Sequence, residues 1–129
     1  MTKTVKELRQ QGLDVMTTFA GADYAAKRAA STNSFNIELR EMSEMAMGSV
    51  WARPEMDRAT RSLVTVAMLT ALGRHHELAI HLGAALNNGC TPGQLKELIL
   101  QSTIYCGFPA ANEACRIAED IFRNRGISF

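Results

Sequence analysis

The chain has 129 residues and a formal net charge of +1; 47% of the residues are hydrophobic and 21% are charged. This length suits one domain spanning 1–129 that buries roughly two thirds of its unfolded surface, and the composition is too apolar for disorder. Because this small net charge creates no basic field, we expect no nucleic-acid partner. The longest apolar run, residues 63–72, is about half of the roughly twenty residues that a membrane span needs, so we expect no membrane partner.

The first segment with helical spacing lies near the N-terminus. Apolar residues within 5–19 recur at a loose helical spacing, which Gly21 interrupts. Asn33 is a residue type that caps helices, so a second helix is expected to begin there and to continue toward Trp51. We therefore expect residues 1–32 to form an N-terminal helical segment, in which we find no motif.

Capping residues, proline and glycine divide the rest of the chain. Asp57 suits the N-cap of a buried helix that Gly73 ends. Thr91 and Gln94 form a capping-box pattern, with Pro92 at the first helical position. The helices expected in this half cover 58–72, 74–88 and 94–105, followed by one that opens at Phe108 and closes at Gly126. The sequence has no alternating strand pattern, so the predicted fold class is all-α with about six helices.

The run 74–88 carries the most informative side chains. At about 100° per residue, Arg74, Glu77 and His81 fall within about 60° of one another on one face of the helix. A cation, a carboxylate and an imidazole on a half-buried helix lose hydration, so they need partners or a ligand. The alternative is a surface pair of Glu77 and His81 that contributes roughly a few tenths of a kcal/mol, with Arg74 as a solvated third charge.

A zinc site is not expected on this helix. The string from His76 to His81 resembles a zinc-protease motif, but that motif places its histidines four residues apart on one face. Here they are five residues apart, which separates them by about 140° around the helix. The sequence therefore predicts no metal.

The cysteines and the N-terminus indicate a reducing compartment. Cys90, Cys106 and Cys115 are odd in number and form no C-x-x-C pair. Residues 1–7 lack the apolar block of a signal peptide. We therefore expect a cytoplasmic location.

Five sequence blocks in this order are typical of one family. The blocks are WARP (51–54), RATRSLVTVAML (58–69), ELAIHL (77–82), ALNNG (85–89) and QSTIYCGFPAAN (101–112). In these blocks, and from about residue 33 to the C-terminus, the chain resembles the carboxymuconolactone decarboxylase family. It resembles the 4-carboxymuconolactone decarboxylase branch more than the alkylhydroperoxidase-like branch. Where the latter has a C-x-x-C-x-x-x-H motif, this chain has Arg74, Glu77 and His81, so thiol peroxidase chemistry is not expected.

The resemblance implies an alkylhydroperoxidase-like helical bundle that assembles into a homo-trimer or homo-hexamer. It also implies a carboxy-lyase of the β-ketoadipate pathway of aromatic degradation, with a small carboxylated lactone as its partner. That enzyme removes CO2 from 4-carboxymuconolactone to give 3-oxoadipate enol-lactone. The departing carboxylate lies γ to the lactone carbonyl through a C=C bond, so its electrons flow into that carbonyl and no cofactor is expected.

With this reaction we associate three catalytic residues. His81 is expected to be the general acid, Glu77 the partner that orients or charges it, and Arg74 the cation beside the oxyanion or a substrate carboxylate. Arginine suits carboxylates because its planar fork binds them through two hydrogen bonds. The residues expected to bind substrate are Arg53, Arg58, Arg61, Trp51, Gln101 and Tyr105. The arginines among them are expected to cluster with Arg74 around the helix junction.

Several of these residues have a structural alternative. Arg58 and Arg61 could form salt bridges between subunits of an oligomer. Trp51 could be a core or interface side chain, and Tyr105 could be a buried tyrosine with a hydrogen-bonded hydroxyl.

Three positions depart from the pattern expected of the decarboxylases. Met45 and Met47 stand where we expect His and Trp, and Glu55 stands where we expect Gly. A less polar pocket would favour a family paralogue that acts on another small carboxylated lactone or enol without decarboxylation. A non-catalytic helical oligomer is the remaining alternative.

Overall fold

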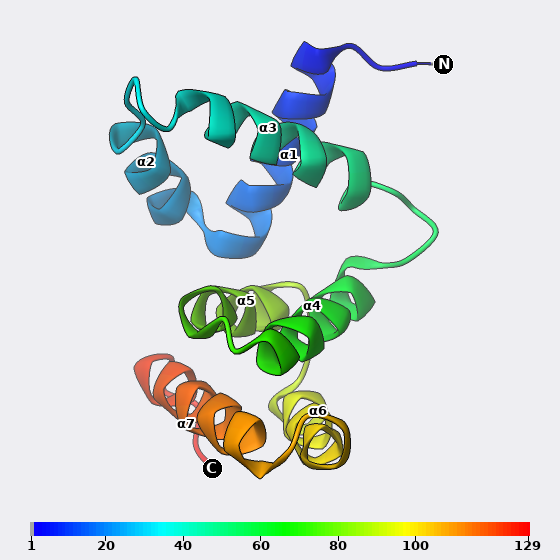
Figure 1. Ribbon diagram of the computed structural model, residues 1–129, viewed down its shortest axis with the longest axis vertical. Helices are drawn as coiled ribbons and strands as arrows, with labels where there is room; N and C mark the ends of the chain where they lie inside the picture. The colour runs from blue at the N-terminus through cyan, green and yellow to red at the C-terminus, as the bar shows by residue number, and fades with distance from the viewer. Residues whose placement is uncertain (1) are drawn as a thin grey trace. The chain divides into compact units, whose positions relative to one another are not determined.

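The computed structural model describes residues 2–129, which form seven α-helices and no strand (Figure 1). In chain order these are α1 (Val5–Ala20), α2 (Ala22–Ala30), α3 (Ile37–Val50), α4 (Arg58–Leu72), α5 (His75–Asn87), α6 (Pro92–Tyr105) and α7 (Phe108–Asn124). The all-α prediction is confirmed, with one helix more than expected. The helices pack as two compact units, the first ending at Asp57 and the second covering Arg58–Phe129. One domain over 1–129 stays a prediction.

The additional helix is α2, which follows α1 after a sharp turn at Gly21. The φ angle of Gly21 is 90°, a backbone conformation that residues with a Cβ rarely adopt. Five of the nine residues of α2 are alanine, the strongest helix former, yet none of the nine is buried. The helix therefore forms without the periodic apolar stripe from which helices are recognised in a sequence.

The start of α3 differs from the prediction by one turn. Asn33 does act as a cap, because its Oδ1 accepts hydrogen bonds from the backbone N–H groups of Phe35 and Asn36. These bonds close a turn over residues 34–36, and the helix itself begins at Ile37. A capping side chain was therefore identified correctly, but the element it stabilises is the turn before the helix.

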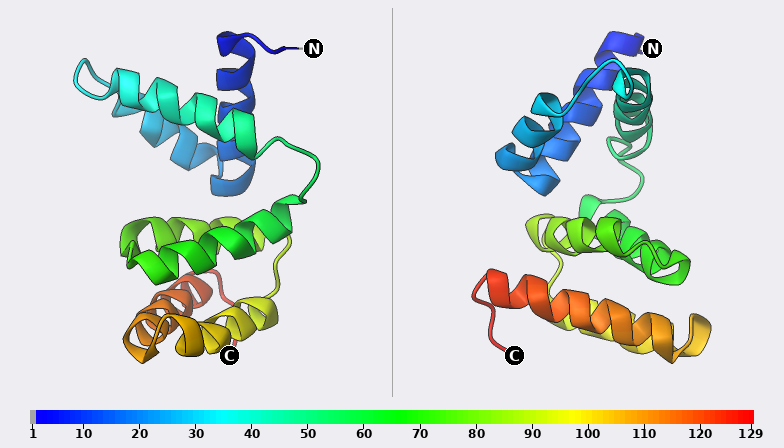
Figure 2. Two further views of the ribbon diagram at one scale, coloured as in Figure 1. Left: turned by 45° about the vertical axis from the view of Figure 1, so that its right-hand side comes forward. Right: turned by 60° about the vertical axis from the view of Figure 1, so that its left-hand side comes forward.

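In the first unit, α1 and α3 cross in close contact (Figure 2). A Cβ atom at Gly12 would overlap the backbone carbonyl of Glu44, and one at Gly48 would overlap that of Leu8. Glycine is therefore required at both points of the crossing. Beside the crossing, Nε of Arg9 donates to Oε2 of Glu44 at 3.0 Å. The buried carboxylate of Glu44 is therefore paired with a cation.

The second unit consists of two helix pairs, α4 with α5 and α6 with α7, that pack against each other (Figure 2). Its core consists of apolar side chains from all four helices and the loop before α6: Val66, Leu78, Leu82, Ala85, Cys90, Leu95, Ala114, Ile117, Ala118 and Phe122. Arg125 joins α5 to the end of α7, because its guanidinium donates to Asn87 Oδ1 at 2.8 Å and to the carbonyl oxygen of Gly83 at 3.1 Å. No helix within residues 2–129 combines the length and the apolar character needed to cross a membrane.

Candidate functional site

The predicted catalytic residues lie at the start and the middle of α5. Arg74 is the N-cap residue, so the helix begins at His75, one residue later than predicted. Glu77 is exposed in the first turn of the helix. His81 follows one turn later and is half-buried, close enough for the Glu77 charge to act on its imidazole. Glu77 and His81 therefore share the helix face predicted from their spacing, whereas Arg74 lies just outside the helix.

Burial controls the charge of His81. Loss of hydration lowers the pKa of the imidazole below its usual value, and the negative charge of Glu77 raises it by a smaller amount. Its Nδ1 atom is fully covered. The neutral imidazole is therefore the favoured form of His81 at neutral pH in the free chain.

Two contacts place the start of α4 beside the end of α5. The side-chain amide of Asn88 donates to Ser62 Oγ at 3.0 Å, and the Cys90 thiol donates to the carbonyl oxygen of Ala59 at 3.2 Å. The two helices are joined at their other ends by a short turn at Gly73. They therefore run antiparallel along each other.

This arrangement separates the predicted arginine cluster. Arg58 and Arg61, both half-buried, lie in the first turn of α4, beside the C-terminal end of α5. Arg74 lies at the N-terminal end of α5, a helix of 13 residues, which is about 20 Å long. The prediction of one cluster is wrong for Arg58 and Arg74, because the antiparallel hairpin holds its two ends apart.

Arg53 and Trp51 belong to the first unit. Trp51 is only 8% exposed, and its ring lies 5.4 Å from that of Phe19, between centroids. It is therefore a core side chain of this unit, which was the structural alternative for this residue. Arg53 is exposed, with its Nε 3.9 Å from Oε2 of Glu55.

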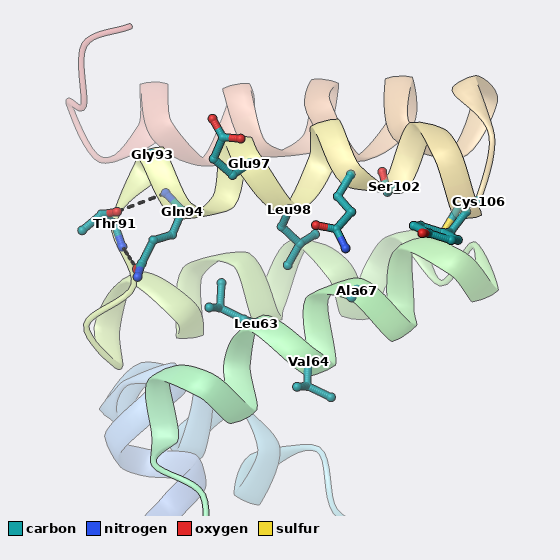
Figure 3. Close-up of a pocket in the computed structure, with 12 residues that line it drawn as sticks. Leu63, Val64, Ala67, Thr91, Gly93, Gln94, Glu97, Leu98, Ser102 and Cys106 are labelled. Carbon is teal, nitrogen blue, oxygen red and sulfur yellow. Dashed lines mark hydrogen bonds between the residues drawn. The ribbon is translucent and has the colours of Figure 1, made fainter.

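Gln101 and Tyr105 line an open groove of about 890 Å³ between α4 and α6 (Figure 3). The residues that line it are Leu63, Val64, Ala67, Thr91, Gly93, Gln94, Glu97, Leu98, Gln101, Ser102, Tyr105 and Cys106. Tyr105 is 81% exposed in the single chain, so it is not a core side chain of this unit.

The chemistry of the groove is mostly apolar, with one carboxylate. Leu63, Val64 and Leu98 are among its apolar lining residues, and Glu97 is the single charged residue among those that line it. Arg74, Glu77 and His81 are not among its lining residues. The structure therefore brings Gln101 and Tyr105 together, but not with Arg74, Glu77 and His81.

Most residues that line the groove were not predicted as site residues from the sequence. The capping box fixes the Gln94 side chain (Figure 3). Thr91 Oγ1 accepts a hydrogen bond from the Gln94 N–H at 3.1 Å, and Gln94 Oε1 accepts one from the Thr91 N–H at 2.9 Å. Glu97 and Cys106 are exposed or half-exposed, with no spacing that marks them. Only the packing of α6 on α4 assembles them. Across the described part of the chain, no three His, Cys, Asp or Glu side chains are grouped so as to hold a metal ion.

Two known proteins are similar to this chain over most of its length. It is 46% identical over 120 residues to the 4-carboxymuconolactone decarboxylase of Acinetobacter baylyi, which covers 92% of this chain and 90% of that protein. It is 31% identical over 115 residues to the nitrosuccinic acid decarboxylase npaB of Metarhizium robertsii, covering 88% of this chain and 80% of that protein.

The family is shown independently by a match over most of the helical chain. Residues 39–120, from the first turn of α3 into the last turns of α7, match the carboxymuconolactone decarboxylase family. The match includes α5 with Glu77 and His81 and the α4–α6 groove. By this match and by the two relatives, the chain belongs to the carboxymuconolactone decarboxylase family.

Proposed function

We propose that the chain is a carboxy-lyase that converts 4-carboxymuconolactone into 3-oxoadipate enol-lactone, in the β-ketoadipate route of aromatic degradation. The observation that carries this proposal is the 46% identity, over 92% of the chain, to a 4-carboxymuconolactone decarboxylase. The second relative is also named as a decarboxylase, which supports the reaction class separately from the substrate.

The substrate's own structure explains how the reaction proceeds. The C–C bond to the departing carboxylate breaks, and its electron pair moves through the C=C bond into the lactone carbonyl to give a dienolate and CO2. A proton then adds to the carbon next to that carbonyl, which restores the lactone. The protein must therefore bind a carboxylate, stabilise the developing oxyanion and supply one proton. No cofactor and no metal is part of this proposal.

We assign the proton to His81, with Glu77 as the group that supports its charged form. The lowered pKa of the half-buried imidazole leaves little imidazolium at neutral pH in the free chain. A dianionic substrate beside the ring would raise that pKa, because an opposite charge favours imidazolium. His81 would then become a proton donor when substrate is bound.

Arg74 is the arginine that we assign to the oxyanion or to a substrate carboxylate beside His81. It precedes Glu77 by three residues, at the same end of α5. Arg58 lies at the far end of the hairpin, too distant to bind the same small lactone within one chain. Substrate binding by Arg53, Arg58, Arg61, Trp51, Gln101 and Tyr105 stays a prediction, with salt bridges between subunits as the alternative for Arg58 and Arg61.

A homo-trimer or homo-hexamer is part of the proposal. The second unit exposes several large apolar side chains, and large exposed apolar patches are uncommon on monomeric proteins. They are Leu72 and Met68 of α4, Leu100, Ile104 and Tyr105 of α6, and Phe108 of α7. An assembly that covers them accounts for their exposure in the single chain.

We also propose that the enzyme works in the cytoplasm. Cys106 and Cys115 are thiols that form no disulfide in the folded chain. A reducing compartment keeps such thiols unpaired.

A turnover assay tests the proposal. 4-Carboxymuconolactone is generated in situ, and CO2 release and loss of the lactone are followed for the wild type, His81→Asn and His76→Asn. His76 is exposed on the same helix, so its variant is a matched control. We expect rapid turnover by the wild type and the control, and a loss of about a hundredfold or more in His81→Asn. Turnover by His81→Asn within a few-fold of the wild type would show that the acid is another residue.

The second relative favours one alternative substrate class. Nitrosuccinic acid carries a nitro group that can accept the electrons released with CO2, as the lactone carbonyl does in carboxymuconolactone. This chain has Met45 and Met47, which depart from the pattern expected of the decarboxylases. If it does not turn over the lactone, small carboxylates with such a group are the next substrates to assay. CO2 release separates this alternative from isomerisation or protonation of an enol, and absence of any turnover would leave the non-catalytic oligomer.

A further inference from the structure

Two arginines of the first unit lie together in a part of the chain that the proposed reaction does not use. They are Arg28 near the end of α2 and Arg40 in the first turns of α3. Nη2 of Arg28 donates to the carbonyl oxygen of Arg40 at 3.3 Å, and Nη1 of Arg40 donates to the carbonyl oxygen of Arg28. Each side chain therefore reaches the backbone of the other residue, and both cross the space between α2 and α3.

The other contacts of this pair are with neutral oxygens. Arg28 Nη2 also donates to Ser43 Oγ, and Arg40 Nη1 lies 3.5 Å from Thr32 Oγ1. The two hydroxyls in turn donate to the carbonyl oxygens of Arg40 and Arg28, both at 2.9 Å. Neither guanidinium forms an ion pair with a carboxylate of residues 2–129. Arg9 of the same unit, by contrast, has two carboxylates within 3.4 Å.

The donors of the pair exceed the acceptors that the fold supplies. Nε of Arg28 is buried, and no group of the described residues accepts a hydrogen bond from it. A charged donor that is removed from water without an acceptor is costly, so it calls for a partner.

The helix dipole does not neutralise this charge. The C-terminal end of α2 carries roughly half a negative charge. It faces the full positive charges of Arg28 and Arg40, and Lys27 adds another in the same helical turn. The helix end therefore offsets only a part of the positive charge of these side chains.

We propose that Arg28 and Arg40 form a binding site for an oxyanion, the carboxylate or phosphate group of a small molecule. Planar guanidinium groups match both anions, since each anion accepts two parallel N–H bonds. Both arginines are half-buried, so the anionic group would be enclosed while the rest of the ligand stays in solvent. The site belongs to the first unit and is distinct from Arg74, Glu77 and His81 of the second.

Isothermal titration calorimetry tests this site with inorganic phosphate and, separately, with malonate, each at constant ionic strength in chloride. We expect saturable binding of one of the two anions, one per chain, and the stronger of the two identifies the source of the oxyanion. Arg28→Met and Arg40→Met should each weaken Kd by about tenfold or more. Arg116→Met is the matched control, since it removes an exposed guanidinium already paired with Glu113, and should leave Kd unchanged.

Hydrogen exchange supplies a measurement that needs no variant. The bound anion should slow amide exchange in residues 28–43 of the wild type and leave residues 91–105 unchanged. Absence of heat and of protection with both anions would overturn the proposal. So would an equal loss of binding in Arg116→Met. No binding together with a changed assembly size in Arg40→Met would also overturn it, because an acidic side chain of a second copy would then occupy the pair.

Discussion

At the scale of single residues, His81 shows a conflict between burial and the task of a proton donor. A general acid must carry its proton before it reacts, yet loss of hydration lowers the pKa of this imidazole. Glu77 opposes that shift but does not outweigh it. A dianionic substrate adds negative charge at the moment when the proton is needed. The arrangement therefore suits an acid that is charged by its own substrate.

The pH dependence of turnover follows from this conflict. The rate should be high where His81 is imidazolium and should fall as the pH rises through its pKa. In kcat/KM, which reports the free enzyme, we expect this fall below the ordinary histidine value of about 6.5. In kcat, which reports the substrate complex, it should occur at higher pH. Pre-steady-state and steady-state rates across the range measure both profiles.

Glu77→Gln provides the internal check on these profiles. Loss of the negative charge removes the contribution that raises the pKa of His81, so both falls should move to lower pH. The profile belongs to the coupled pair, so the shift between variants is the informative quantity. A rate that rises with pH in the wild type would instead identify His81 as a base.

At the scale of helices, the α1–α3 crossing depends on two residues without side chains. Gly12 and Gly48 are the points at which the backbone of one helix meets the other helix. The charged pair of Arg9 and Glu44 closes the same crossing from the side. Close contact and a buried ion pair thus support the first unit together with its buried apolar side chains, Val15, Met16, Phe19 and Trp51.

Gly12→Ala should therefore destabilise the chain by about 1–3 kcal/mol, because its Cβ overlaps the backbone of α3. Gly93→Ala in α6 is the matched control. Its Cβ would meet nothing closer than 3.7 Å, so it should be neutral or should stabilise by about 0.5 kcal/mol. Urea unfolding of both variants measures the difference. Equal effects of the two substitutions would contradict the close crossing.

At the scale of the whole molecule, the exposed apolar surface is the main unexplained feature of a single chain. Ile104 is 75% exposed, and Leu100, one turn earlier in α6, is 51% exposed. With Tyr105 they line a second hollow on α6, and Tyr105 also lines the groove between α4 and α6. Apolar area of this kind contributes roughly 25 cal/mol per Å² when it is covered. The surface therefore favours association of copies.

Ile104→Lys should reduce the assembly to smaller species, because a charge in a covered apolar contact loses its hydration. Light scattering after size-exclusion chromatography measures the mass. Lys96→Ala, an exposed position on the same helix, is the control and should keep the wild-type mass. An unchanged mass in Ile104→Lys would place the interface elsewhere.

Local signals were sufficient for most helix boundaries. The capping box of Thr91 and Gln94 forms as predicted, and Phe108 opens the last helix. These features depend on residues within one turn of each other, so their effect does not require the rest of the fold. The spacing of Glu77 and His81 is of the same kind, since a helix brings them to one face whatever it packs against. The sequence alone therefore determined the all-α class, the shared face of α5 and, through its ordered blocks, the family.

Tertiary structure decided what depends on residues distant in the chain. The burial of Trp51 against Phe19, the lowered pKa of His81 and the groove lined by Tyr105 all need helices that meet across a unit. The separation of Arg58 from Arg74 likewise follows from the antiparallel course of α4 and α5. Residue order constrains neighbours along a helix, but solvent exclusion and distance between helices arise only from packing. That is why the sequence could nominate residues for the site, while the charge state of His81 and the separation of the arginines required the structure.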